Sequence, residues 1–145
     1  MRISLYVSGL VLTAFALGGC GTTNTTSSEL VSKASVKQTH CIPAERELIE
    51  QRVAQTLNAC YSSKGGSLLP VNGALIPMSG FAVHKEAVSG GTRFSVLNDL
   101  YYSMTVDVAT QPQACGTTLN IYAVSGFWSK SVEHVLSAAR GEPIG

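Results

Sequence analysis

Apolar residues recur at helical spacing in two segments of the chain, 43–62 and 126–140. In the first segment the apolar positions are Ile49, Val53, Leu57 and Cys60. In the second segment they are Trp128, Val132, Val135, Leu136 and Ala139. Pro43 suits the first position of a helix and Gly141 suits the position just after one, so both segments have a boundary residue of the expected type. We expect two helices, each with one face turned toward a core.

The segments between these two helices show the alternation of apolar and polar residues that is typical of a half-buried sheet. The residues expected to face the core are clearest at Tyr102, Met104, Val106 and Val108. Shorter alternating runs occupy 81–88, 93–97 and 117–124. The chain therefore predicts an α+β domain, in which an antiparallel sheet of four to five strands is flanked by an N-terminal and a C-terminal helix. Both helices should cover the apolar face of the sheet, because each side needs the other to bury its apolar residues.

A β-hairpin is expected between the first helix and the alternating strands. The apolar runs 68–71 and 74–77 are separated only by Asn72-Gly73, and both residues of such a turn adopt positive φ easily. Pro70 and Pro77 have no N–H to donate to a neighbouring strand. We therefore expect this hairpin to lie at the edge of the sheet or to form an excursion from it.

The first twenty residues have the pattern of a secretory leader. Arg2 is the only charged residue before Glu29, and it is followed by an apolar run over residues 3–17. This run is shorter than the roughly 20 residues that a membrane-spanning helix needs. The next residues, Leu17-Gly18-Gly19-Cys20, resemble the lipobox of bacterial lipoproteins. The alternative interpretation is an ordinary cleaved leader with an incidental cysteine.

The lipoprotein resemblance implies cleavage before Cys20, a diacylglyceryl thioether on its sulfur and acylation of the new amino group. Two or more acyl chains hold a protein stably at a membrane, whereas one chain holds it only marginally. The residue after the lipidated cysteine is Gly21 rather than the Asp that favours inner-membrane retention. The resemblance therefore implies a lipid-anchored protein on the periplasmic face of the outer membrane, or in the cell envelope if the host is Gram-positive.

Residues 21–39 are rich in Thr and Ser, contain no aromatic residue and show no sustained periodicity. We interpret residues 20–39 as the lipidated cysteine followed by a flexible tether, with a root-mean-square reach of roughly 23–26 Å. Residues 40–145 are then expected to form a single α+β periplasmic domain.

Composition and charge exclude several classes of protein. Of the 145 residues, 45% are hydrophobic and only 13% are charged, which is too apolar for an intrinsically disordered chain. The formal net charge is +1, and removal of Arg2 with the leader leaves equal numbers of basic and acidic residues. The chain therefore has no basic excess with which to bind nucleic acid, and we expect no nucleic-acid partner.

The cysteines predict one disulfide. If Cys20 carries lipid, then Cys41, Cys60 and Cys115 remain in an oxidising compartment. Cys41 and Cys60 lie at opposite ends of the first helix, about 28 Å apart, which is too far for a disulfide. Cys115 should therefore pair with one of them. We favour Cys60–Cys115, because Cys60 lies on the apolar stripe that faces the sheet, and Cys41–Cys115 is the alternative.

No catalytic, metal-binding or cofactor-binding residue is predicted. His84-Lys85-Glu86 resembles the first half of a zinc-deaminase signature, but the second half, Pro-Cys-x-x-Cys, is absent. His40, His84 and His134 do not have the spacing of metal ligands. Catalytic groups are recognised by their mutual geometry, and the sequence shows no such set. We therefore expect a protein that is not an enzyme.

The outward face of the sheet is the candidate binding face. Its members are polar or aromatic residues of the predicted strands, namely Arg93, Tyr101, Asp107, Asn120 and Tyr122. Tyrosine and arginine are enriched at protein interfaces. We expect a binding or assembly accessory that acts on an envelope protein, such as an inhibitor or an exclusion factor. The alternatives are a periplasmic hydrolase and a carrier of a small apolar ligand held between the sheet and the helices.

Overall fold

The computed structural model of the chain describes residues 24–62, 68–77, 80–99, 101–111 and 115–144, and the lipobox cysteine Cys20 lies outside them. A five-stranded antiparallel sheet has the order β1-β7-β6-β5-β4. Its strands are β1 (Val36–Ile42), β4 (Phe81–Val88), β5 (Gly91–Asn98), β6 (Tyr101–Gln111) and β7 (Gly116–Ala123). The helices are α1 (Ser27–Lys33), α2 (Arg46–Tyr61) and α3 (Ser129–Arg140), with a short 3-10 turn η1 (Gly126–Trp128) before α3. The predicted α+β class is confirmed.

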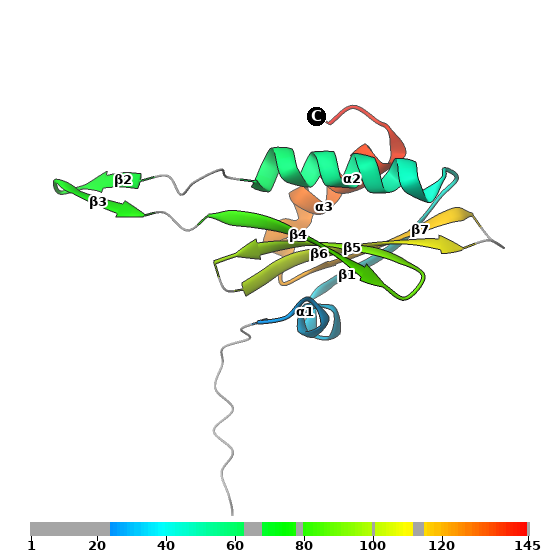
Figure 1. Ribbon diagram of the computed structural model, residues 1–145, viewed down its shortest axis with the longest axis horizontal. Helices are drawn as coiled ribbons and strands as arrows, with labels where there is room; N and C mark the ends of the chain where they lie inside the picture. Colours follow the sequence, from blue (N-terminus) through cyan, green and yellow to red (C-terminus); the bar gives the residue numbers. More distant parts are fainter. Residues whose placement is uncertain (1–23, 63–67, 78–79, 100, 112–114, 145) are drawn as a thin grey trace, which may run out of the picture.

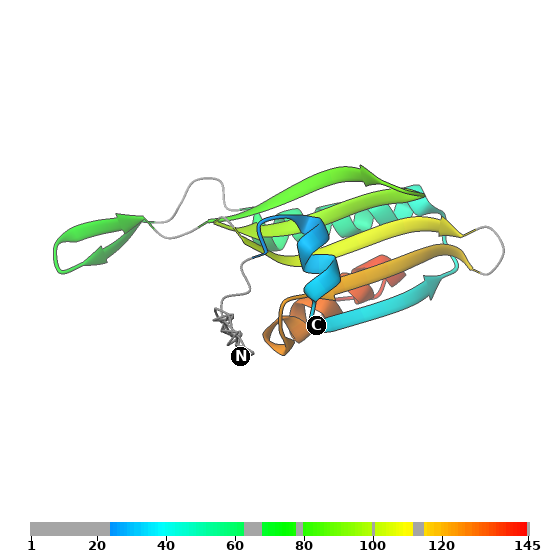
Figure 2. The same cartoon turned by 90° about the horizontal axis from the view of Figure 1, so that it is seen from below.

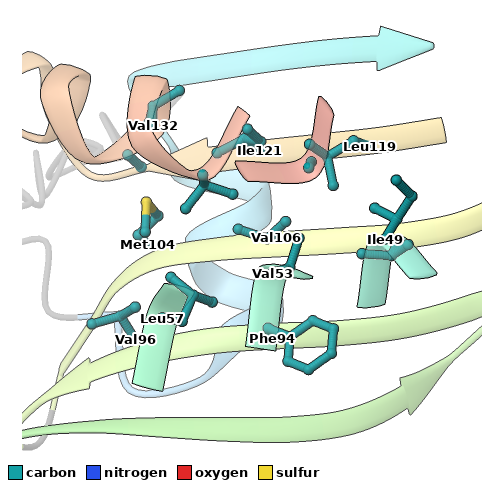
Figure 3. Close-up of a cluster of buried hydrophobic side chains, with 14 of the residues drawn as sticks. Ile49, Val53, Leu57, Phe94, Val96, Met104, Val106, Leu119, Ile121 and Val132 are labelled. Atoms are coloured by element: carbon teal, nitrogen blue, oxygen red, sulfur yellow. The ribbon is translucent and has the colours of Figure 1, made fainter. Parts of the chain in front are cut away.

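The sheet separates two helical layers of unequal size. Helices α2 and α3 lie together on one face of the sheet, and α1 lies on the other face (Figure 1). The core lies between the sheet and the α2–α3 layer, where apolar side chains from both sides meet (Figure 3). Its fully buried members include Ile49, Val53, Leu57, Val96, Met104, Val106, Val108, Leu119 and Ile121.

The two predicted helices are present, with small differences at their starts. Helix α2 begins at Arg46 and buries the predicted positions Ile49, Val53 and Leu57. Cys60 belongs to the same stripe but is exposed, since it lies in the last turn, beyond Leu57. The second helical segment opens with the 3-10 turn η1, so its α-helical part starts only at Ser129. Gly141 ends it in the left-handed conformation, with φ of 76°.

The predicted hairpin is also present. Strands β2 (Leu68–Val71) and β3 (Ala74–Pro77) pair only with each other and form a separate two-stranded sheet. Asn72 and Gly73 have φ of 50° and 80°, as the turn requires. Figure 1 shows the hairpin extending away from the main sheet, so of the two expected positions the excursion is the one observed.

One strand residue lies on the face opposite to that expected. The register between β5 and β6 shifts between Val96 and Leu97, and such a bulge changes which side chains point to each face. Tyr102 was expected to face the core with Met104, but its hydroxyl lies 3.3 Å from Nδ1 of His84. The prediction for Tyr102 is therefore wrong, because simple alternation does not continue through a bulge.

The expected flexible tether is wrong for residues 24–39, which belong to the folded domain. Helix α1 begins after Thr26, and its Leu30 is completely buried. Strand β1 follows at once and pairs antiparallel with β7 as an edge strand. A polar segment was interpreted as solvated because it lacks a long apolar stripe. Helix α1 instead buries Leu30 and is held by its capping box and by the hydrogen bond of Ser27 to Glu86.

The disulfide joins Cys41 to Cys115, whose Cα atoms are 5.5 Å apart, and Cys60 is free and exposed. The favoured pairing Cys60–Cys115 is therefore wrong, and the alternative is confirmed. The reason is strand β1, which pairs Cys41 with Thr118 in β7, only three residues after Cys115 in the sequence. Because β1 was not predicted, no local pattern placed Cys41 beside the β6–β7 turn.

Candidate functional site on the polar face of the sheet

A row of polar residues crosses the sheet on the face opposite the core. The strand register places Glu86 beside Arg93, Arg93 beside Asp107, Asp107 beside Asn120 and Asn120 beside Thr39. Residues directly opposite each other on antiparallel strands have neighbouring side chains. All five strands therefore contribute one member each to a continuous polar row.

A bidentate ion pair between Arg93 and Asp107 lies at the centre of this row. Nε and Nη2 of Arg93 donate hydrogen bonds to the two carboxylate oxygens of Asp107, at 2.7 Å and 2.8 Å. The side chains of Arg93 and Asp107 are only 12% and 13% exposed. The hydrogen bond to Asp107 raises the pKa of the Arg93 guanidinium above its ordinary value, against a smaller opposing effect of burial. Such a pair is rigid and directional, and removal of either partner leaves a largely buried charge.

Helix α1 lies over this ion pair. Oγ of Ser27 donates a hydrogen bond to Oε1 of Glu86 at 2.5 Å, and it accepts one from Nη1 of Arg93 at 3.4 Å. Leu30, one turn further along α1, is completely buried. Figure 2 shows α1 lying across the middle strands of the sheet. The polar row therefore acts as the docking surface for a helix of the same chain.

The segment before α1 is fixed as well. The backbone N–H of Tyr102 donates a hydrogen bond to the carbonyl of Asn24 at 2.9 Å, and Asn24 is only 3% exposed. Oδ1 of Asn24 is buried without a hydrogen-bond partner among the described residues. The chain is thus held at the start of β6 before α1 begins.

A capping box fixes the first turn of α1. The backbone N–H of Glu29 donates to Oγ1 of Thr26 at 3.1 Å, and the backbone N–H of Thr26 donates back to the Glu29 carboxylate at 3.2 Å. The hydroxyl and backbone N–H of Thr25 donate to the same carboxylate, at 2.9 Å and 2.8 Å. These hydrogen bonds lower the pKa of Glu29 below its ordinary value. The negative charge also suits the positive end of the helix dipole.

The structure brings together only some of the residues predicted to form the binding face. Arg93, Asp107 and Asn120 share the polar row, but Arg93 and Asp107 lie under α1 and are not available to an outside partner while α1 is docked. Tyr122 lies in the next row, beside Thr105. Tyr101 is 45% exposed and lies apart from both rows, because the bulge that turns Tyr102 toward His84 leaves its neighbour Tyr101 opposite Asn98, off the polar face. Binding of a partner by these residues stays a prediction.

Sequence reasoning did not identify Ser27 and Leu30, the residues of α1 that contact the polar face of the sheet. It also did not identify Glu86 as a residue of this site. One signal was available, since Thr26 followed three residues later by Glu29 matches the pattern of a capping box. The docking of α1 depends on contacts with β4, β5 and β6, which lie more than fifty residues away in the sequence. No local pattern reports such contacts.

The histidines are placed separately. His84 contacts Tyr102, while Nε2 of His40 lies 2.9 Å from Oε1 of Gln38. Burial, and to a lesser degree the charge of Arg140, lowers the pKa of His40. Within the part of the chain that the structure describes, no three His, Cys, Asp or Glu residues are grouped so that they could hold a metal ion.

Besides a cavity of about 250 Å³ that is lined in part by Gly90, Gln111 and Asn120, the end of the domain that carries the disulfide has two further cavities. The larger, of about 650 Å³, lies between the start of α2 and the β6–β7 turn and is lined in part by Pro43, Glu45 and Cys115. The smaller, of about 290 Å³, is lined in part by Arg52 and Arg140. Core side chains lie in the space between the sheet and the helices where the predicted apolar ligand would lie, and one of them, Ile42, also lines the smaller cavity.

Comparison with known proteins gave no relative. The chain matches no protein-family model, and neither the search of characterised proteins nor that of solved structures found a match. Among the described helices, none has the length and apolar character to cross a membrane.

Proposed function

We propose that this chain is a lipid-anchored cell-envelope lipoprotein whose domain acts as a binding or assembly accessory on the membrane surface. The lipobox-like segment Leu17–Cys20 supports the anchor, and Gly21 supports the periplasmic face of the outer membrane. The domain would meet an envelope protein as an inhibitor, an exclusion factor or an assembly factor.

The observation that carries this proposal is the docking of residues 24–33 on the sheet. Only Gly21, Thr22 and Thr23 separate Cys20 from Asn24, whose carbonyl accepts a hydrogen bond from Tyr102. A fully extended chain over this distance spans at most about 14 Å. A lipid anchor on Cys20 would therefore hold the domain directly at the bilayer surface, where partners in or on the same membrane are the ones it meets.

The arrangement of polar groups supports binding more than catalysis. The buried charges of the polar row, Arg93 and Asp107, are used to pair with each other, and Glu86 is used to hold Ser27. Side chains that an outside partner could contact include the exposed aromatic ring of Tyr101 and the partly buried ring of Tyr122 on β7. Tyrosine contributes large contact area at protein interfaces at a low cost in conformational entropy.

Lipidation is tested by mass spectrometry of the mature protein isolated from the membrane fraction of its bacterial host. The expected N-terminal peptide begins at Cys20 and carries a diacylglyceryl group and an amide-linked acyl chain. A peptide that begins elsewhere, or an unmodified Cys20, would overturn the anchor.

Partner binding is tested by pull-down from a detergent extract of cross-linked cells. We expect a specific envelope protein that is captured by the unaltered chain and lost when Tyr101→Ala and Tyr122→Ala are combined. Leu48→Ala, at an exposed position of α2, is the matched control and should retain the partner. Equal capture by all three forms, or no specific partner at all, would count against a binding role for Tyr101 and Tyr122.

A further inference from the structure

The two ends of the domain differ in chemistry. One end, here called the anchor end, contains Asn24, the start of β6 and the turn η1. Backbone hydrogen bonds join these parts, because Tyr102 donates to Asn24 and Val124, just before η1, donates to Ser103. Both views of the molecule place the start of α1 and the start of α3 toward the same end of the sheet (Figures 1 and 2).

The anchor end displays exposed aromatic side chains. Phe127 is 92% exposed, the largest exposure among the described large hydrophobic residues, and Tyr101 is 45% exposed. The β2–β3 hairpin leaves from the same end in Figure 1, and the chain contains no charged residue from Gly65 to Val83. Exposed charged residues of both signs lie near this end, among them Asp99, Lys130, Glu133 and, at the start of β1, Lys37.

The opposite end is charged. It contains the start of α2 and the end of α3, which Arg52 connects by donating a hydrogen bond to the carbonyl of Ala139. The charged residues in these segments are Glu45, Arg46, Glu47, Glu50, Arg52, Arg140 and Glu142. A protein that lies on a membrane keeps its charged surface in water and turns aromatic groups toward the lipid headgroups.

We propose that the anchor end rests on the phospholipid bilayer and that Phe127 inserts among the lipid headgroups. This inference builds on the proposed function, since it takes the lipid on Cys20 as given. The link of at most about 14 Å from Cys20 to Asn24 leaves the domain little freedom to turn this end away from the membrane. Transfer of an exposed aromatic ring from water to lipid is favourable, and this gain in free energy does not depend on anionic headgroups.

The test uses the position of a single indole in lipidated protein reconstituted into phosphatidylcholine vesicles with brominated acyl chains, which quench indole fluorescence at short range. Trp128 is the only tryptophan of the chain. Phe127→Trp combined with Trp128→Phe places the indole at the anchor end. Leu48→Trp combined with Trp128→Phe places it on α2, at a position that is 42% exposed, and this is the matched control.

We expect brominated lipid to quench the indole at position 127 at least threefold more than the indole at position 48. Equal quenching at both positions, or none at either, would overturn the proposal. A blue shift at position 127 that depends on protein concentration and needs no vesicles would also overturn it, because a second copy of the chain would then cover Phe127.

Two further measurements separate the possible failures. Circular dichroism checks that each double variant is folded. If Trp128→Phe unfolds the domain, the quenching of native Trp128 is instead compared between the unaltered chain and Phe127→Ser. We expect Phe127→Ser to reduce that quenching at least twofold, and an unchanged value would contradict the proposal. Mass spectrometry of the same samples confirms lipid on Cys20, so absent quenching in lipidated protein refutes the orientation and leaves the anchor standing.

Discussion

The two faces of the sheet are both covered by helices, but different forces hold the covers in place. On one face, α2 and α3 bury a continuous layer of apolar side chains. On the other, α1 buries a single large apolar residue, Leu30, and is held by Ser27 over the Arg93–Asp107 ion pair. Hydrophobic burial is non-directional and large, whereas the polar contacts are directional and contribute less net free energy. The apolar face should therefore determine whether the domain folds, and the polar face where its N-terminal segment lies.

Neighbouring residues of β5 give the sharpest contrast between the faces. Phe94 belongs to the core, and Ser95 lies on the polar face, where it accepts a hydrogen bond from Thr105 at 3.3 Å. We expect Phe94→Ala to lower the free energy of unfolding by about 3–5 kcal/mol and Ser95→Ala to lower it by about 1 kcal/mol. Chemical denaturation monitored by circular dichroism measures both, and equal losses would contradict the division of roles.

The disulfide is expected to have the next largest effect. It links β1 to the β6–β7 turn across a sequence separation of 74 residues. We expect Cys115→Ser to lower the free energy of unfolding by about 2–4 kcal/mol, since the unfolded chain regains conformational entropy. Cys60→Ser is the control and should change stability by less than about 0.5 kcal/mol, because Cys60 is exposed. Equal losses for Cys115→Ser and Cys60→Ser would instead indicate that Cys60 is paired with Cys115.

The ion pair tests the polar face directly. We expect Asp107→Ala to cost about 2–3 kcal/mol, because it leaves the mostly buried guanidinium of Arg93 without its partner. The double variant Arg93→Met with Asp107→Leu should recover at least half of that loss. Limited trypsin digestion should cleave Asp107→Ala after Lys33 or Lys37 faster than it cleaves the unaltered chain. If the free energy of unfolding falls but the rate of tryptic cleavage is unchanged, the ion pair stabilises the sheet and does not hold α1 in place.

The smallest expected effect is on the pH dependence of stability, through His40 on the edge strand β1. Burial lowers the pKa of His40 in the folded protein, so the unfolded chain binds the proton more tightly. This contribution to stability is therefore complete above the ordinary histidine pKa and is lost as the pH falls below it, toward the folded-state pKa. We expect His40→Gln to reduce the fall in melting temperature between about pH 7 and pH 5. An identical fall in both proteins would show that His40 does not contribute.

The sequence predicts the apolar face well and the polar face poorly, for a physical reason. Ile49, Val53 and Leu57 repeat along α2, so a local pattern reports where the helix and the core lie. The place of α1 depends instead on Glu86 and Arg93, and polar residues on a strand look the same whether water or a helix covers them. Strand β1 also lies in a polar segment without a clear local pattern, so it was not predicted. Without β1, the pairing of Cys41 with Cys115 was not the favoured one.

Hydrogen exchange of the mature protein, followed residue by residue, tests the docking of α1 most directly. We expect the amides of Leu30 to Lys33, and the amide of Tyr102 that donates to Asn24, to exchange far more slowly than those of an unstructured peptide. Exchange of residues 24–35 at the rate of an unstructured peptide would contradict this expectation. The N-terminal segment would then be a tether after all, and the domain would not be held at the membrane surface.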